Sequence, residues 1–336
     1  MQNSETRRID WIDALRGLAM FFVIWGHTFP TNKWGIRKYI YSFHLPLFFF
    51  ISGLNFRDSD RLSFKEFLKK RIKSLIIPYI IINIVCYLIM LILFNLHVIE
   101  SFSYWKDFVG IFYSHSEVFI QPSGPSWFLI TLFLTEMIFF FLKKNSTSDF
   151  NLGISVSICG LISYVNSISG YQQFLPLHLD TVFMGVVFYY AGYLFLKNMY
   201  RIKQVFNTKL KRFIFGLSFG MIGFAAQYFN RRVSMHANLY GSITLFLIGS
   251  IFTIVALVFF VTLFIKKSYM FKTIGKNTIF YLGYHNIIIL ILLENCPRLL
   301  NSNIMVFAIA TILTILLLPI SLLVKKYCPI LIGKFR

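Results

Sequence analysis

The sequence has few charged residues, and most of those are basic. Charged residues make up 14% of its 336 residues, with 33 Lys and Arg against 13 Asp and Glu. Soluble domains carry charge on about a quarter of their residues, so this composition excludes an ordinary water-soluble protein. Hydrophobic residues account for 57% of the chain and include 40 Phe. We therefore predict an all-α polytopic integral membrane protein.

Signals for several other classes are also missing. The four cysteines are far apart and form no CxxC pair, which argues against a disulfide framework or a zinc site. We find no Walker loop, no GxSxG, no HExxH and no metal-ligand spacing, so we expect no bound metal or cofactor. No basic patch stands apart from the apolar runs, which argues against nucleic-acid binding. The first apolar run has no small-residue cleavage signal and is interpreted as a retained span.

Ten segments are long and apolar enough to cross a bilayer, which takes about 20 residues per helix. We expect spans at 11–30, 42–56, 75–94, 125–142, 151–169, 178–196, 213–230, 240–265, 276–294 and 303–324. The second is short, and Pro46 and Ser52-Gly53 indicate a broken or tilted element. We expect a single membrane-embedded domain over 1–336, because the loops leave no room for a separate soluble domain.

The basic residues predict the orientation of these spans. Placing the N-terminus in the cytoplasm puts 25 of the 33 Lys and Arg into inside segments and 7 into outside segments. Cytoplasmic loops are typically enriched in Lys and Arg. Both termini are therefore predicted to be cytoplasmic.

The first predicted span carries three ionisable residues, Asp13, Arg16 and His27. At 100° per residue, Arg16 and His27 point about 20° apart on a helix, with Asp13 on the same face. Such a polar stripe is typical of a channel or tunnel wall. The alternative is an Asp13–Arg16 pair in the headgroup layer, with His27 at the opposite interface bonded to a backbone carbonyl.

Other ionisable residues lie within or beside predicted spans. Glu136 and His285 lie near the middle of theirs, where they cannot reach water, so they favour a buried polar site. His44, His178 and Asp180 lie near span ends, where an interfacial role suits the two histidines well.

Two further stretches could contribute to a site. "FKEFLKKRIKSLIIPY" holds Lys70, Arg71 and Lys73, which would either bind lipid phosphates or form an anion site for a phosphate-bearing cosubstrate. "QPSGPSWFL" places Trp127 at a membrane interface, where it would act as an anchor by default.

Taken in order, five stretches resemble the membrane-bound acyltransferase-3 family, and the fucose 4-O-acetylase-like proteins within it. These stretches are "RIDWIDALRGLAMFFVIWGH", "SFHLPLFFFISGLNF", "KKRIKSLIIPY", "PSWFLITLF" and "IGKNTIFYLGYH". The resemblance implies a ten-helix acyltransferase of the bacterial cytoplasmic membrane. It would transfer an acyl group, usually acetyl, from cytoplasmic acyl-CoA to a hydroxyl of a cell-surface or lipid-linked glycan.

The resemblance also implies roles for residues. The essential histidine of the family corresponds to His27, and the arginine of its "DALRG" motif to Arg16. The Arg-x-x-Arg motif of the family is matched at Arg71, but Ser74 replaces the second arginine, with Lys70 and Lys73 as substitutes.

Acyl transfer needs a base and a donor that stabilises the developing oxyanion. We expect His27 as base, Arg16 and Arg71 as donor-binding groups, and Glu136, Asp180 or His285 as orienting or sugar-binding groups. Asp13, His44 and Trp127 would support the site, with acyl-CoA as cosubstrate and membrane lipid as a partner.

The rival interpretation is a transporter or flippase for a saccharide or small solute, which a polar bundle interior would also fit. The oligomeric state stays open.

Overall fold

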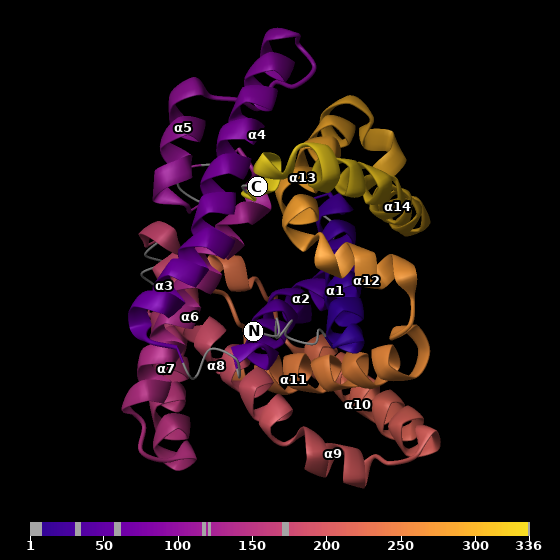
Figure 1. The fold of residues 1–336 in the computed structure, drawn as a ribbon. Coiled ribbons are helices and arrows are strands. Elements are labelled where there is room, and N and C mark those ends of the chain that lie inside the picture. Colours follow the sequence, from indigo (N-terminus) through magenta and orange to yellow (C-terminus); the bar gives the residue numbers. More distant parts are fainter. Residues whose placement is uncertain are drawn as a thin grey trace.

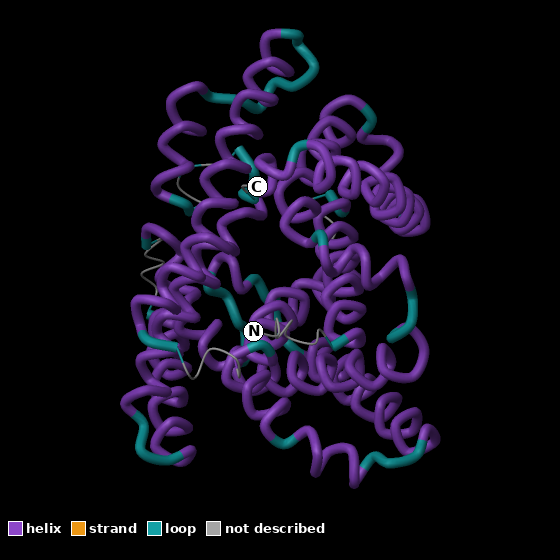
Figure 2. Tube along the Cα trace, viewed as in Figure 1, coloured by secondary structure: helices purple, strands orange, loops and turns teal. Residues whose placement is uncertain are grey.

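The computed structural model describes residues 9–30, 35–56, 62–115, 119, 122–169 and 175–334. Within these ranges every regular element is a helix (Figures 1 and 2), and the only strand-like pairing is a single antiparallel bridge between Ser234 and Leu239. The predicted all-α class is confirmed. The predicted loop segments 1–8, 31–34 and 57–61 lie outside the described residues.

Seven helical stretches in the described part of the chain are long and apolar enough to span a membrane. They are Phe64–Asn95 (α3, η2 and α4), Gly124–Asn145 (η3 and α6), Asp149–Ile168 (α7), Pro176–Lys197 (η4 and α8), Ile243–Ile265 (α11 and η6), Thr278–Asn295 (α13) and Asn303–Tyr327 (α14). The other three predicted spans coincide with α1 (Asp10–Thr28), α2 (Gly35–Leu54) and α10 (Lys209–Phe229). The chain is therefore a multi-pass membrane protein, while the count of ten and the side of each terminus stay predictions.

Four segments that the sequence assigned to loops contain helices. They are α3 (Phe64–Arg71), α5 (Tyr104–Tyr113), α9 (Met199–Val205) and α12 (Tyr269–Lys276). A capping box starts α3, because the Ser63 hydroxyl accepts from the Glu66 N–H while the Glu66 carboxylate accepts from the Ser63 N–H. These helices are too short or too polar to span, which is why the hydropathy pattern missed them.

The second span is longer than predicted and is not broken, so of the two alternatives, broken or tilted, the break is wrong and the tilt stays a prediction. Helix α2 begins at Gly35 and continues through Pro46 to Leu54. Proline has no N–H for the carbonyl of residue 42, which is four positions earlier. The hydroxyl of Ser250 on α11 lies 2.7 Å from that Ser42 carbonyl oxygen and can donate to it, in place of its other acceptor, the Phe246 carbonyl of its own helix at 2.7 Å. A neighbouring helix can thus satisfy the group that proline leaves unpaired, as membrane helices require.

Close contact between α1 and α12 positions one wall of the bundle. A Cβ added to Gly17 would lie 2.0 Å from the Phe271 carbonyl oxygen, and one added to Gly275 would lie 1.9 Å from that of Asp13. Only glycine lets the two backbones approach so closely. This contact holds Lys276, at the end of α12, beside the Arg16 region of α1.

Apolar side chains cover the outside of the bundle as well as its core. Phe150 of α7, Phe229 of α10 and Ile304 of α14 are each at least three-quarters exposed. A soluble monomer rarely leaves large contiguous apolar patches exposed, but lipid tails cover such a surface without cost. In Figure 1, α10 and α11 run side by side above α9, and α14 lies at the upper right.

We expect Gly275→Ala to destabilise the protein by about 1–3 kcal/mol, because the new methyl group would overlap the Asp13 carbonyl. Thermal unfolding in detergent would measure the change. Gly220→Ala is a matched control within α10, since its added Cβ would meet only the Ala256 Cβ at 3.7 Å. Equal melting temperatures for both variants would contradict the close α1–α12 contact.

Candidate functional site

The first of two polar cavities found among the described residues, here called the arginine cavity, has a volume of about 420 Å³ and is lined mainly by α6, α13 and the segment from α3 to η2 (Ile72–Ile76), with Arg16 as the contribution of α1. Its polar lining consists of Arg16, Ser52, Asn55, Arg71, Ser74, Glu136, Lys276, Asn277, Thr278 and Lys334. Four of these side chains are cationic and one is acidic. The cavity therefore suits an anionic ligand.

A buried ion pair forms one wall of the arginine cavity. Arg71 ends α3, and its Nε lies 2.9 Å from Oε2 of Glu136 in the middle of α6. Their side chains are 14% and 3% exposed, and the buried Tyr189 lies against both. The positive charge of the Arg71 guanidinium compensates the negative charge of the Glu136 carboxylate, which lies in the middle of a predicted span, away from water. Glu136 is thereby explained as the partner of Arg71.

The cations that sequence reasoning missed come from two distant segments. Lys276 ends α12, and Lys334 follows the C-terminal turn η8 (Pro329–Ile332). Gly333 makes this turn with a φ of +68°, a conformation that glycine adopts without strain. Ser74, which replaces the second arginine of the family motif, lines the same cavity. The two lysines therefore supply positive charge to the cavity from which that arginine is missing. The side-chain amide of Asn277, buried without a hydrogen-bond partner among the described residues, also lines it.

The second cavity, here called the histidine cavity, has a volume of about 350 Å³. Its polar lining, with Tyr41 and Trp127 included, consists of His27, Arg37, Tyr41, His44, Trp127, Arg232, Ser234, His236 and Asn286. The imidazole of His236 comes from the loop between α10 and α11. Burial and the neighbouring His115 lower the pKa of His236 below its usual value, so this side chain is neutral near pH 7.

Two histidines near His27 have defined tautomers. The Nδ1–H of His44 donates to the Ile40 carbonyl at 2.8 Å, and that of His285 donates to the Tyr281 carbonyl at 2.6 Å. Each ring therefore presents an Nε2 lone pair. The rings of His27 and His285 are 5.4 Å apart between centroids. Nε2 of His285 is buried and has no hydrogen-bond partner among the described residues, so it is available to accept from His27.

A rigid turn places Trp127 in the histidine cavity. The Asn83 amide donates to the Ser126 hydroxyl at 2.8 Å, and the Ser123 hydroxyl donates to the Gly283 carbonyl at 2.8 Å. These bonds hold the start of α6 (Trp127–Asn145) between α4 and α13. Trp127 is 5% exposed, so its side chain packs inside the protein and does not contact lipid.

Three apolar side chains separate the two cavities. Phe48 of α2, Phe128 of α6 and Leu282 of α13 line both of them. The Phe48 and Phe128 rings are 5.6 Å apart between centroids. We call these three residues the septum. The predicted polar stripe along α1 thus joins two cavities, with Arg16 in one and His27 in the other, and the septum interrupts the expected tunnel.

The remaining predicted residues lie at various distances from the cavities. Asp13 contacts Arg16 at 3.3 Å but does not line the arginine cavity. Lys70 and Lys73 are exposed and line neither cavity, although Lys70 is close enough to act on Glu136 electrostatically. Asp180 lies outside both cavities, 3.6 Å from His115. Of the three side chains expected to orient His27, the structure brings only His285 to it.

Sequence reasoning missed Arg37, Arg232 and His236 because they lie in or near predicted outside loops. The positions of these residues in the sequence follow no motif or periodic pattern that links them to His27. Only the fold brings their side chains into the same cavity as His27. In contrast, His27 and Arg16 were visible because ionisable residues are rare in an apolar run.

Comparison with known proteins identifies one match. The acyltransferase-3 model, described as an acyltransferase domain, matches residues 9–324. Neither a curated protein nor a solved structure matches the chain significantly. The match does not distinguish branches of the family.

We expect Glu136→Leu to lower the free energy of unfolding by about 3–5 kcal/mol, because it leaves the Arg71 guanidinium buried without its counterion. Arg71→Met should cost a similar amount. The double variant should recover most of the loss, since a buried ion pair can be replaced by apolar residues at little cost. Denaturant unfolding in micelles measures all three. A double variant with a free energy of unfolding no higher than that of the less stable single variant would show that the two residues are not energetically coupled.

Proposed function

The chain belongs to the acyltransferase-3 family, and from this premise we propose that it is an O-acyltransferase that uses acyl-CoA, usually acetyl-CoA, to modify a hydroxyl of a cell-surface or lipid-linked glycan. The observation that carries the proposal is the pair of cavities on either side of the septum. The first has four cationic side chains and the second has His27 together with Arg37 and Arg232, and α1 contributes to both. We place the protein in the bacterial cytoplasmic membrane with the arginine cavity facing the cytoplasm.

The arginine cavity would bind the donor. Guanidinium and ammonium groups are the usual partners of phosphate oxygens, and Arg16, Lys276 and Lys334 present such groups at this cavity. The phosphates of CoA would stay near these cations, while the thin pantetheine arm extends between the helices. Lys70 and Lys73 would add long-range attraction at the entrance.

The thioester would reach His27 through the septum. The arm is narrow, and rotation of the Phe48 and Phe128 side chains would open a path between the cavities. In its closed position the septum keeps water and ions from crossing, which an enzyme that works across a membrane requires. The acyl chain must also fit through this opening, so the septum would favour short acyl groups.

At His27 the acceptor hydroxyl oxygen would attack the thioester carbonyl carbon, and an imidazole nitrogen of His27 would take the hydroxyl proton. The tetrahedral oxyanion would collapse with cleavage of the C–S bond, and the CoA sulfur would leave as the thiol with that proton. His285 would accept from the other nitrogen of His27 and position its ring. The Arg37 guanidinium, which donates to the Tyr41 hydroxyl at 3.3 Å, lies in the same cavity and would stabilise the oxyanion. Transfer through an acetyl-His27 intermediate would use the same groups.

The acceptor would enter the histidine cavity. Tyr41 and Trp127 offer aromatic faces for a sugar ring, and Arg37 and Arg232 favour a glycan that carries phosphate or carboxylate groups.

A transporter could also contain two cavities divided by an apolar layer. The two proposals differ in what they consume. An acyltransferase turns over acyl-CoA when an acceptor is present, whereas a transporter is indifferent to it. Folded wild-type protein that neither binds nor hydrolyses labelled acetyl-CoA would favour the transporter.

We expect His27→Asn to lower acyl transfer by at least about 100-fold, because general-base catalysis contributes about 10²–10⁴-fold. Donor affinity should stay near that of the wild type, since His27 lies across the septum from the arginine cavity. The assay uses labelled acetyl-CoA, protein in lipid nanodiscs and a crude surface-glycan extract. His97→Asn, at an exposed histidine, is the control. Transfer by His27→Asn within tenfold of wild type would exclude His27 as the base.

We expect Lys276→Ala to weaken acetyl-CoA binding by about tenfold or more, because a hydrogen bond to a charged group contributes about 1.5–3 kcal/mol. Lys276 is exposed to solvent, so its removal should not disturb folding. Lys69→Ala removes an exposed cation from the basic segment without touching the cavity and serves as control. Titration calorimetry in nanodiscs measures both. If Lys69→Ala weakens binding as much as Lys276→Ala does, the donor is held by diffuse charge rather than in the arginine cavity.

A further inference from the structure

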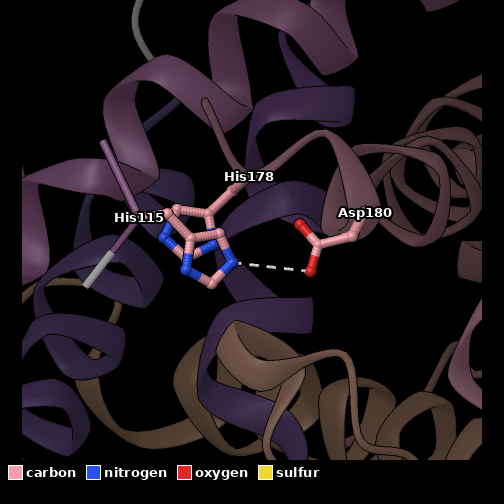
Figure 3. A group of neighbouring side chains, drawn as sticks. All are labelled: His115, His178 and Asp180. Carbon is pink, nitrogen blue, oxygen red and sulfur yellow. Dashed lines mark ion pairs between the residues drawn. The ribbon is translucent and has the colours of Figure 1, made fainter. Parts of the chain in front are cut away.

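A third polar cluster lies outside both cavities and consists of His115, His178 and Asp180 (Figure 3). His115 follows α5, His178 ends the short helix η4, and Asp180 lies in the first turn of α8. All three side chains are almost completely buried, with exposed fractions of 0%, 0% and 3%. The mechanism proposed above uses none of them.

The three side chains lie close together. The two imidazole rings are stacked 3.9 Å apart between centroids, and Nε2 of His115 lies 3.6 Å from Oδ2 of Asp180. One ligating atom from each residue can be chosen so that all lie within 4.8 Å of one another. In Figure 3 the carboxylate faces the edges of both rings.

Several atoms in this cluster are buried without a hydrogen bond. Oδ1 of Asp180 has no hydrogen-bond partner among the described residues, and the His178 ring has at most one, the backbone of His236. Buried polar atoms in native proteins nearly always have one. A proton on His115 would satisfy one oxygen of Asp180 but would leave His178 unchanged. A bound cation would satisfy a lone pair on His178 and on Asp180.

We propose that His115, His178 and Asp180 bind a divalent transition-metal ion, with Zn²⁺ as the preferred ion. Two imidazoles and one carboxylate form a ligand set that zinc commonly takes, whereas Mg²⁺ and Ca²⁺ prefer oxygen ligands alone. Zinc–ligand distances of about 2.0–2.2 Å require the ligating atoms to approach to roughly 3.3 Å. Coordination would require this contraction and a rotation of the two stacked rings, so that a lone pair of each points at the ion. The fourth position is open to water or to His236, whose ring centroid lies 5.0 Å from that of His178.

The ion would connect segments that are far apart in the sequence and fix the wall of the histidine cavity. The His178 ring lies 4.3 Å from the Trp127 ring, and both Trp127 and His236 line that cavity. Leu177 and His178 have φ values of 60° and 51°, a conformation that persists in non-glycine residues only where the surroundings impose it. Metal coordination by His178 would supply this constraint. The ion would thus have a structural role beside the acyl-transfer site, and its presence does not depend on the proposed function.

The test measures the metal content of the full chain, purified through a tag without histidine and without added metal or chelator. Inductively coupled plasma mass spectrometry should find about one zinc ion per wild-type chain. His178→Asn and Asp180→Asn should each lower the content at least fivefold. His97→Asn is the matched control, because asparagine tolerates the left-handed backbone of both His97 and His178. It should retain the wild-type content.

Two further measurements on the wild-type chain need no variant to fold. Removal of the ion with a chelator should lower the thermal midpoint, and stoichiometric Zn²⁺ should restore it. Loading with Co²⁺ should produce the visible absorption of a four-coordinate site with nitrogen and oxygen ligands. Less than a tenth of an equivalent of any transition metal in the wild type, with no thermal shift on adding Zn²⁺, would overturn the proposal. Equal zinc content in His178→Asn and wild type would overturn it as well.

Discussion

The structure depends on compensation of ionisable side chains that lie away from water. Each uncompensated charge in such a place would cost several kcal/mol, which the small net stability of a folded chain cannot absorb repeatedly. The Arg71–Glu136 ion pair is the central example, because it joins the end of α3 to the middle of α6. The Asp13–Arg16 contact on α1 compensates a second pair of charges. These contacts position the cationic groups of the arginine cavity.

Apolar packing then divides the interior into two environments. The septum residues Phe48, Phe128 and Leu282 belong to three different helices, and each contacts both cavities. Because Arg16, Lys276 and Lys334 lie on one side of this layer and His27 lies on the other, binding of an anion and chemistry at an imidazole can occur in separate compartments. This separation is what an acyltransferase would need if its donor and its acceptor approach from different sides of the membrane.

The fold also gathers histidines in two neighbouring places with different chemistry. Around His27, backbone carbonyls fix the tautomers of His44 and His285, and the cavity gives a substrate access to the rings. Around His178, the side chains are fully enclosed and face a carboxylate. Because a substrate can reach the first group, it is suited to catalysis. Because the second group is enclosed by protein, it is suited to binding a metal ion. Trp127 lies between the two groups and contacts His178 and His236.

The sequence alone determined the class of the protein and the residues of α1. Lipid requires long apolar helices, and this requirement is local, so composition and run length predicted the helical spans and made Asp13, Arg16 and His27 conspicuous. The same local argument failed for α2, since the hydroxyl that can donate to the carbonyl left unpaired by Pro46 belongs to Ser250 on another helix. Only the tertiary structure decided that Glu136 pairs with Arg71, that Lys276 and Lys334 join Arg16, and that His115 meets His178 and Asp180. These contacts join residues far apart in the chain, and no periodicity or spacing within one segment encodes which helices become neighbours.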